Sequence, residues 1–325
     1  MVFKGIKRFW SRICYFIQAK KIWSQPRQSD VLIYDADGQE ILLEYLNSWH
    51  PEVLYVRGEQ INVQVFFSFL FRRLTRPSTY IDCFIEKVRP RLVVTYIDNN
   101  PIFLTVSQKH PEVKTLFVQN GLRGNSVDVF EYIGKLDCSE FFVDYKFVFG
   151  SAIGEKYAQY VKGDTVLMGS IKNNFIIKKS LPEQGVIAFV SQWQSEGLHI
   201  DGVFISAEVF SGQFARLIFQ HLMRYAEEKN KRLMIIPRCR KHSDHRAAED
   251  SFFRELLGCE PVYLEPEGVS PGYTAVDSAE VVVAIDSTLG YESIARGNKT
   301  AFFSIRHKLV KDWETNFGWP RDFQD

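Results

Sequence analysis

The feature of this sequence that most constrains its fold is an alternation of short apolar runs with longer stretches of helical spacing. Between residues 30 and 150 the apolar runs are Val31–Tyr34, Val53–Val56, Leu92–Ile97, Leu116–Val118 and Phe147–Phe149, and helical stretches lie at about 40–49, 60–73 and 80–88 and after Pro101. Strands that alternate with helices predict βαβ units and a parallel sheet.

A second series of the same kind begins near residue 185. Its strands are Val186–Val190, Leu233–Ile236, Val262–Leu264, Val281–Ile285 and Thr300–Ser304, and its helices lie at about 208–229 and 246–257. In the longer helix one predicted face carries Phe214, Leu217, Ile218, His221, Leu222 and Tyr225, which places His221 in the core or at its edge.

The polar stretch 165–185 that joins the two series is typical of a hinge. The sequence therefore predicts an α/β fold with two Rossmann-like domains facing across a cleft. The expected parts are a segment 1–29, an N-terminal domain 30–165 and a C-terminal domain 166–325. Because the chain stops soon after Thr300–Ser304, with little room for a closing helix, we expect a truncated C-terminus.

Composition narrows the class of protein. With 46% hydrophobic residues and a net charge of +1, the chain is neither disordered nor a bulk-charge nucleic-acid binder. Its five cysteines are scattered without a CxxC pair, which favours a reducing cytoplasm. No apolar run is long enough for a spanning helix, and no signal-peptide plan is evident.

Residues 1–29 are locally basic, with a charge of +7 and no acidic residue. Apolar side chains recur in this segment at helical spacing, at Phe3, Ile6, Trp10, Ile13, Phe16 and Ile17. Such an amphipathic helix binds an anionic membrane surface or packs on the body of its own protein, and the pattern leaves both interpretations open. The first interpretation predicts peripheral contact with the inner membrane through residues 1–25.

The most informative segment joins the strand Val281–Ile285 to a helix that Ser287 or Thr288 caps. Ligands of open α/β sheets bind beyond the carboxyl ends of strands, and N–H groups at a helix start suit a phosphate. The hydroxyls of Ser287 and Thr288 would add donors to the same anion, and Glu292 could accept hydrogen bonds from a ribose. The alternative is a purely structural cap.

Three other strand ends carry polar clusters. Asp98 is a candidate general base or nucleophile next to Asn99 and Asn100, with an Asx turn as the alternative. Gln119, Asn120 and Gly121 form either a sugar-binding turn or an ordinary one. Arg238 and Arg240 either neutralise a donor phosphate or lie in a solvated basic loop.

Several classes of site are disfavoured. No Walker loop, GxGxxG or GxSxG motif occurs. The stretch Cys239–His245 matches no zinc-ligand spacing, and Asp35-x-Asp37 is more typical of an acidic turn than of a metal site. No metal and no cofactor is therefore predicted.

The order of these motifs resembles the bacterial surface carbohydrate biosynthesis proteins, which look like GT-B glycosyltransferases and share features with Kdo and sialic-acid-type transferases. The residues that carry the resemblance are Ile97–Asn100, Val118–Gly121, Phe149-Gly150, Gly169–Asn174, Phe189–Gln192 and Ile285–Gly297. It implies a nucleotide-sugar donor held by the C-terminal domain through Ser287, Thr288, Glu292, Arg238, Arg240, Ser191, Gln192, Ser170, Lys172 and Asn173. It also implies an acceptor near Asp98, Asn99, Asn100, Gln119, Asn120 and Gly121.

The chain departs from better-known GT-B enzymes around Glu292, because Ala284 and Thr300 stand where an E-x7-E motif would place its partner. The resemblance therefore favours a CMP-sugar over a UDP- or ADP-hexose. The expected function is a metal-independent glycosyltransferase that moves a Kdo-like or nonulosonic acid sugar onto a glycan or lipid-linked glycan in the cytoplasm. A sugar-nucleotide epimerase, a CDP-polyol phosphotransferase and a non-catalytic subunit of a glycan-assembly complex remain alternatives.

Overall fold

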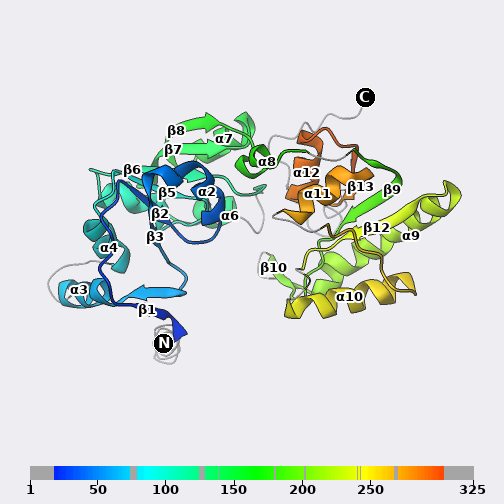
Figure 1. Cartoon of the computed structure of the whole chain (residues 1–325), viewed down its shortest axis with the longest axis horizontal. Coiled ribbons are helices and arrows are strands. Elements are labelled where there is room, and N and C mark those ends of the chain that lie inside the picture. The colour runs from blue at the N-terminus through cyan, green and yellow to red at the C-terminus, as the bar shows by residue number, and fades with distance from the viewer. Residues whose placement is uncertain are drawn as a thin grey trace. The chain divides into compact units, whose positions relative to one another are not determined.

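A computed structural model describes residues 18–73, 79–123, 129–137, 139–178, 181–200, 203–239, 241, 243–266 and 270–303 (Figure 1). They form two compact units. Unit 1 comprises the chain up to residue 120 together with 136–171, and unit 2 comprises 121–135 and the chain from residue 172. The main division thus lies a few residues after the predicted limit at 165. The predicted amphipathic segment Phe3–Ile17 lies outside the described residues.

Unit 1 is built on a six-stranded parallel sheet in the order β3-β2-β5-β6-β7-β8. Its strands are β2 (Val31–Tyr34), β3 (Glu52–Leu54), β5 (Leu92–Thr95), β6 (Lys114–Val118), β7 (Phe142–Val148) and β8 (Lys162–Leu167). The parallel sheet confirms the predicted fold class for this half. Since β3 pairs with one side of β2 and β5 with the other, the strand order reverses between β2 and β5.

The helices that connect the strands of this sheet include α2 (Gln39–Leu46), α4 (Tyr80–Val88), α5 (Val106–Lys109) and α7 (Ser151–Ala158), with short 3-10 turns at Asn47–Trp49 and Phe103–Thr105. Helix α4 begins at a capping box, in which the Thr79 hydroxyl accepts from the Asp82 amide and the Asp82 carboxylate accepts from the Thr79 amide. The predicted helix after Pro101 is only the second 3-10 turn followed by α5.

A second, two-stranded sheet belongs to the same unit. Strand β1 (Lys20–Ile22) pairs in parallel with β4 (Gln60–Asn62), and β4 leads directly into α3 (Val63–Arg73). The predicted helix at 60–73 is therefore wrong in its first three residues, which form β4 because they pair with a strand nearly forty residues earlier.

Unit 2 is built on a four-stranded parallel sheet in the order β12-β9-β13-β14. The strands are β9 (Glu183–Val190), β12 (Arg232–Ile236), β13 (Ala279–Ala284) and β14 (Thr300–Phe302). The remaining elements are α6 (Val129–Gly134), α8 (Ile171–Phe175) at the division between the units, the antiparallel pair β10 (Leu198–Ile200) and β11 (Val203–Ile205), a π-helical turn η3 (Glu208–Gly212), α9 (Gln213–Glu228), α10 (Asp244–Leu257), α11 (Pro271–Ser278) and α12 (Thr288–Ala295). The predicted strand Val262–Leu264 is reduced to a single bridge between Tyr263 and Ile235.

Alternate residues of the unit 2 strands belong to two hydrophobic cores, one on each face of the sheet. On one face Ile187 and Phe189 of β9 pack with Phe219 of α9 and Phe253 of α10. On the other face Val186, Ala188 and Val190 pack with α11, and Leu289 of α12 packs against the same core. Helices therefore cover both faces, as expected for a parallel sheet whose strands are apolar throughout.

The interpretation of α9 is corrected at His221. The buried side of this helix carries Phe214, Ala215, Ile218, Phe219, Leu222 and Ala226, whereas Leu217, His221 and Tyr225 are exposed. Residues 217, 221 and 225 repeat every four positions and border the apolar stripe. Phe189 of β9 and Phe253 of α10 pack against this helix and decide which border is covered.

Candidate functional site

The strand order of unit 2 identifies one edge of its sheet as the candidate site. The chain runs from β9 outward to β12 and then returns to β13 on the other side of β9, so the order reverses between β9 and β13. Ligands of open α/β sheets bind at the carboxyl ends of the strands at such a reversal. The loops there are Ser191–Gln192 after β9 and Asp286–Ser287 after β13, and both contain residues that the sequence analysis predicts for the donor site.

These two loops are joined by a reciprocal pair of hydrogen bonds. The Gln192 side-chain amide donates to Asp286 Oδ1 over 2.6 Å, and the Asp286 backbone amide donates to Gln192 Oε1 over 3.0 Å. Asp286 is buried and Gln192 is half-buried. The pair holds the start of α12 at a constant position relative to β9.

Ser287 caps α12 as predicted. It has extended backbone angles, and its hydroxyl oxygen accepts from the Leu289 amide over 3.3 Å. Thr288 Oγ1 accepts from the Leu122 amide over 3.1 Å. Both side chains remain half-buried rather than enclosed, and each hydroxyl can still donate its own hydrogen. An anion at this helix start would therefore find hydroxyl donors within unit 2.

Helix α12 lies unusually close to the sheet because its third residue is Gly290. A Cβ atom built there would lie 2.7 Å from the Ala284 Cβ and 2.9 Å from the Phe302 ring. Beside it, the rings of Tyr291 and Phe302 stack with centroids 4.3 Å apart. Glu292 is buried, with 8% of its surface exposed, so it offers little surface to a ribose in this structure.

A buried carboxylate, Glu249 of α10, ties together two further loops at the same edge. Its Oε1 accepts from the Ser191 hydroxyl over 2.6 Å and from the Arg238 amide over 3.0 Å, and its Oε2 accepts from the Cys239 amide over 2.9 Å. Burial, together with the nearby Glu249 charge, raises the pKa of the Cys239 thiol to about 11. Sequence reasoning missed Glu249, because nothing in its own helix distinguishes it from a surface glutamate.

Arg238 is exposed at this edge, and its guanidinium donates to the Trp193 carbonyl over 3.1 Å and to Gln194 Oε1 over 3.3 Å. Arg240, its predicted companion, lies outside the described residues. A small cavity lies under the same edge and is lined by Phe189, Gln192, Trp193, Ser211, Phe252 and Ile285. The predicted residues Ser191, Gln192, Arg238, Ser287 and Thr288 thus meet at the carboxyl edge of one sheet.

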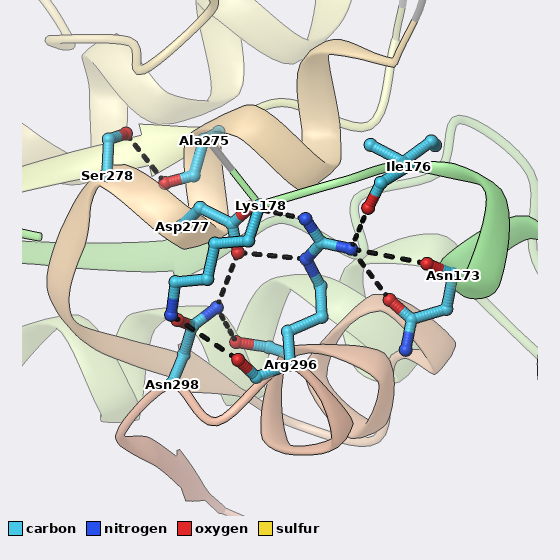
Figure 2. Close-up of polar contacts among 9 residues, drawn as sticks. Asn173, Ile176, Lys178, Ala275, Asp277, Ser278, Arg296 and Asn298 are labelled. Atoms are coloured by element: carbon cyan, nitrogen blue, oxygen red, sulfur yellow. Dashed lines mark hydrogen bonds and ion pairs between the residues drawn. The ribbon is translucent and has the colours of Figure 1, made fainter. Parts of the chain in front are cut away.

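Asn173 and Lys172 lie elsewhere in unit 2. Figure 2 shows Asn173 bonded to Arg296, which follows the last residue of α12, whereas Ser287 precedes the first. An eight-residue helix is about 12 Å long. Asn173 is therefore separated from Ser287 by about the length of α12. The Lys172 ammonium lies 5.7 Å from the centroid of the Tyr273 ring. Ser170 belongs to unit 1, two residues before the division.

Arg296 is the centre of a buried polar cluster (Figure 2). Its Nε donates to Asp277 Oδ1 over 2.9 Å, and its Nη1 donates to Asn173 Oδ1 over 2.9 Å and to the Ile176 carbonyl over 2.7 Å. Asn298 donates to the same Asp277 oxygen over 3.0 Å. These bonds hold residues 173–176 against α11 and α12. The members of the cluster therefore stabilise the fold of unit 2.

In unit 1 the Asp98 carboxylate is 1% exposed and accepts a hydrogen bond of 2.5 Å from the Tyr157 hydroxyl. Asn100 makes the Asx turn that was weighed for Asp98, since its Oδ1 accepts from the Ile102 amide over 3.0 Å. Asn99 is exposed. A catalytic role of Asp98 would therefore require its carboxylate to become accessible, and it stays a prediction.

Gln119 is also buried, and its Oε1 accepts from the Phe149 amide over 2.9 Å, which links the carboxyl ends of β6 and β7. Asn120 is half-buried at the end of unit 1. Gly121 belongs to unit 2, where a Cβ atom would lie 3.5 Å from Thr288 Oγ1. Gln119, Asn120 and Gly121 thus fall on both sides of a division that the linear motif did not reveal.

The reversal point of unit 1 holds a buried carboxylate that lies outside the predicted site residues. Asp35 has a left-handed φ of 77° and is 2% exposed, and its Oδ2 accepts from Arg57 Nε over 2.9 Å. Asp37 Oδ2 lies 3.0 Å from Arg57 Nη1. Next to them Gly38 has φ 76° beneath the Tyr96 ring, where no side chain fits. The predicted acidic turn Asp35-x-Asp37 is therefore paired with a cation, Arg57, from the loop after β3.

Residues 116–325 match the sequence profile of a family described as "putative O-antigen biosynthesis protein". The chain belongs to this family. Membership in the O-antigen biosynthesis family assigns the protein to surface-glycan biosynthesis. No curated protein matches the chain.

Solved structures similar to this O-antigen biosynthesis protein include the UDP-GlcNAc 2-epimerase from Methanocaldococcus jannaschii. It is 12% identical with a TM-score of 0.46, over 86% of this chain and 85% of that chain. The wall teichoic acid polymerase TagF is 10% identical with a TM-score of 0.47, over 88% and 72%. The spinosyn forosaminyltransferase SpnP is 13% identical with a TM-score of 0.41, over 88% and 84%.

Two further properties concern only the part of the chain that the structure describes. None of its helices combines the length and the apolar character needed to cross a bilayer. In the same residues no group of three or more His, Cys, Asp or Glu side chains is arranged to hold a metal ion.

Proposed function

We propose that this protein is a glycosyltransferase of surface-polysaccharide biosynthesis that binds the nucleotide part of its sugar donor at the carboxyl edge of the unit 2 sheet. The proposed donor is a CMP-activated Kdo-like or nonulosonic acid sugar, and the proposed acceptor is a growing glycan or lipid-linked glycan. Family membership supports the glycan-biosynthesis part of this proposal.

The observation that carries the proposal is the position of the α12 N-terminus at the reversal between β9 and β13. A donor phosphate at this helix start would meet backbone N–H groups and the positive end of the helix dipole. The capping bond from Leu289 to Ser287 is long, at 3.3 Å, so a phosphate oxygen could replace it without loss of a strong bond. As the glycosidic bond breaks, the same donors would stabilise the charge on the leaving nucleotide.

Arg238 would contribute a cation to the same phosphate, because its guanidinium is exposed and is held only by neutral groups in the bonds described above. Glu249 would act indirectly by holding the loops of Ser191 and Arg238. The Gln192–Asp286 pair would set the position of α12 against β9. No metal ion takes part in the proposed mechanism.

A donor screen by thermal shift tests the binding site. CMP or a CMP-sugar at about 100 times its dissociation constant should stabilise unit 2 by about 2.7 kcal/mol. The S287A/T288A variant should lose this shift, whereas the control S278A, which removes a hydroxyl that donates to the nearby Ala275 carbonyl, should keep it. Equal shifts in both variants would refute the site. No shift with CMP, CDP or UDP would instead favour a non-catalytic subunit.

The D98N variant tests the proposed base or nucleophile, because Asn retains an oxygen for the Tyr157 hydroxyl. We expect D98N to keep the donor-induced shift and to lose turnover. Wild-type turnover by D98N would remove Asp98 from the mechanism. Product analysis with UDP-N-acetylhexosamine and CDP-glycerol distinguishes glycosyl transfer from the epimerase and the polyol phosphotransferase alternatives.

The proposed place of action is the cytoplasmic face of the inner membrane, with peripheral contact through residues 1–25. Its support is the charge of +7 without acidic residues in 1–29 and the apolar spacing from Phe3 to Ile17. Deletion of residues 1–25 should move the protein from the membrane fraction to the soluble fraction, and unchanged partitioning would remove this part of the proposal.

A further inference from the structure

Helix α3 of unit 1 is apolar on more than one side. Val65 is buried in the unit. On another side Phe67, Leu70 and Phe71 are 53%, 42% and 71% exposed, and their spacing of three and four residues places them on one stripe. Large aromatic side chains gathered on an exposed stripe are unusual for a soluble domain and mark interaction surfaces.

Trp23 extends this stripe. It directly follows β1, is 71% exposed, and its carbonyl accepts from the Gln64 side-chain amide over 2.8 Å. That bond places Trp23 beside the first turn of α3, and Figure 1 shows β1 next to α3 at one end of unit 1. We call Trp23, Phe67, Leu70 and Phe71 the α3 patch.

The charges around the α3 patch are mainly positive. Helix α3 carries Arg72 near its end, and β1 contributes Lys20 and Lys21. Glu86 pairs with Arg72, so this one cation is partly neutralised. Aromatic rings beside lysines and arginines are the chemistry of surfaces that lie on anionic bilayers, where the rings enter the headgroup region and the cations remain in the aqueous layer.

We infer that the α3 patch is a docking surface for an anionic lipid bilayer. The inference rests on the proposed peripheral membrane contact and extends it from the N-terminal segment to a folded part of unit 1. It is independent of the donor and of the reaction. A second copy of the chain would favour an uncharged rim, and the surrounding cations of two copies would repel each other.

Flotation with vesicles tests this inference on the full chain. Wild-type protein should bind vesicles of phosphatidylcholine mixed with phosphatidylglycerol and bind pure phosphatidylcholine more weakly. The F67S/F71S variant should bind the mixed vesicles about tenfold or more weakly, because two aromatic side chains no longer enter the lipid. The matched control L217S/Y225S removes two exposed apolar side chains from α9 in unit 2 and should bind like the wild type.

Two measurements keep the interpretation unambiguous. If the α3 patch is open, F67S/F71S and the single variant F71S should melt within a few degrees of the wild type and keep its size on gel filtration. A large fall in melting temperature would show that these side chains are packed within the protein, and a change from dimer to monomer would show that a second copy covers them; either result overturns the inference. Equal vesicle binding by F67S/F71S and wild type also overturns it.

Vesicle binding by the α3 patch and donor binding by unit 2 are measured separately, so one can fail without the other. The donor-induced thermal shift is measured on the same variants and depends on unit 2. F67S/F71S should therefore retain the shift whether or not it binds vesicles.

Discussion

Replacing Arg296 with Met should destabilise unit 2 by about 3–5 kcal/mol, the cost of leaving one member of a buried ion pair without its partner. Arg296 and Asp277 have side chains that are 4% and 3% exposed, so neither charge is compensated by solvent when the other is removed. The variant also leaves the Asn173 side chain and the Ile176 carbonyl without their bonds of 2.9 Å and 2.7 Å to Arg296.

The pH dependence has a definite sign. Burial alone raises the pKa of Asp277, but hydrogen bonds from Arg296 and Asn298 and the Arg296 charge lower it overall. A carboxyl group with a lowered folded-state pKa contributes stability above its unfolded pKa and loses it as the pH falls through the folded value. The difference between wild type and R296M should therefore shrink in acid.

Hydrogen exchange measured by mass spectrometry suits this test, because a chain of two units does not guarantee a two-state melt. Amides of β13 and α12 should exchange faster in R296M, while those of β5 and β6 in unit 1 should not change. R254M is the matched control: Arg254 pairs with Glu260 at the surface, where solvent screens the charges and such a pair adds little to stability.

The double variant R296M/D277L separates loss of the pair from loss of packing. If the unpaired charge causes the destabilisation, the double variant should be more stable than R296M alone, although Asn298 then lacks its acceptor. The reasoning is refuted if R296M costs less than about 1 kcal/mol, or if the two substitutions simply add.

Three further outcomes are expected. G290A should lower the free energy of unfolding by about 1–3 kcal/mol, because its Cβ would meet the Phe302 ring, and urea titration should show no such loss for G150A, where the space is open. Burial of Asp82 raises its pKa, but the neighbouring His110 ring and the hydrogen bond from the Thr79 amide at the helix cap outweigh burial and lower the pKa to about 2. The contribution of Asp82 to stability should therefore be complete above about pH 4 and fall toward pH 2, and D82N should flatten this part of a urea-midpoint curve. EDTA should leave the donor-induced thermal shift unchanged. Loss of the shift in EDTA would contradict a metal-independent site.

The residues of the candidate site were predictable to different degrees. Ser287 was recognised from its neighbours, because a serine between an apolar strand and an amphipathic stretch is a local signal of a helix cap. Arg238 was recognised as a polar residue beyond a strand, whereas Gln192 was named only through the family resemblance. Glu249 was missed, since it reaches the loops of Ser191 and Arg238 from a helix that follows both in the sequence.

The residues grouped by linear motifs separated for a similar reason. Lys172 and Asn173 stand in one polar run with Ser170, yet Asn173 bonds Arg296 beyond the far end of α12, more than a hundred residues away. Asp98 was correctly placed after a strand, but its burial depends on Tyr157 of α7. No spacing within either motif contains these partners.

The alternation of apolar runs and amphipathic stretches was enough for the α/β class and for most strands, because periodicity and capping depend on residues a few positions apart. The order of the strands was not encoded locally: β13 pairs with β9 across about ninety residues, and this pairing creates the reversal that brings Gln192 to Asp286. Contacts between distant segments likewise determine which border of α9 is buried. They also determine which carboxylates pair with a cation. Backbone pattern is a property of neighbours, whereas a site is made by residues that only folding brings together.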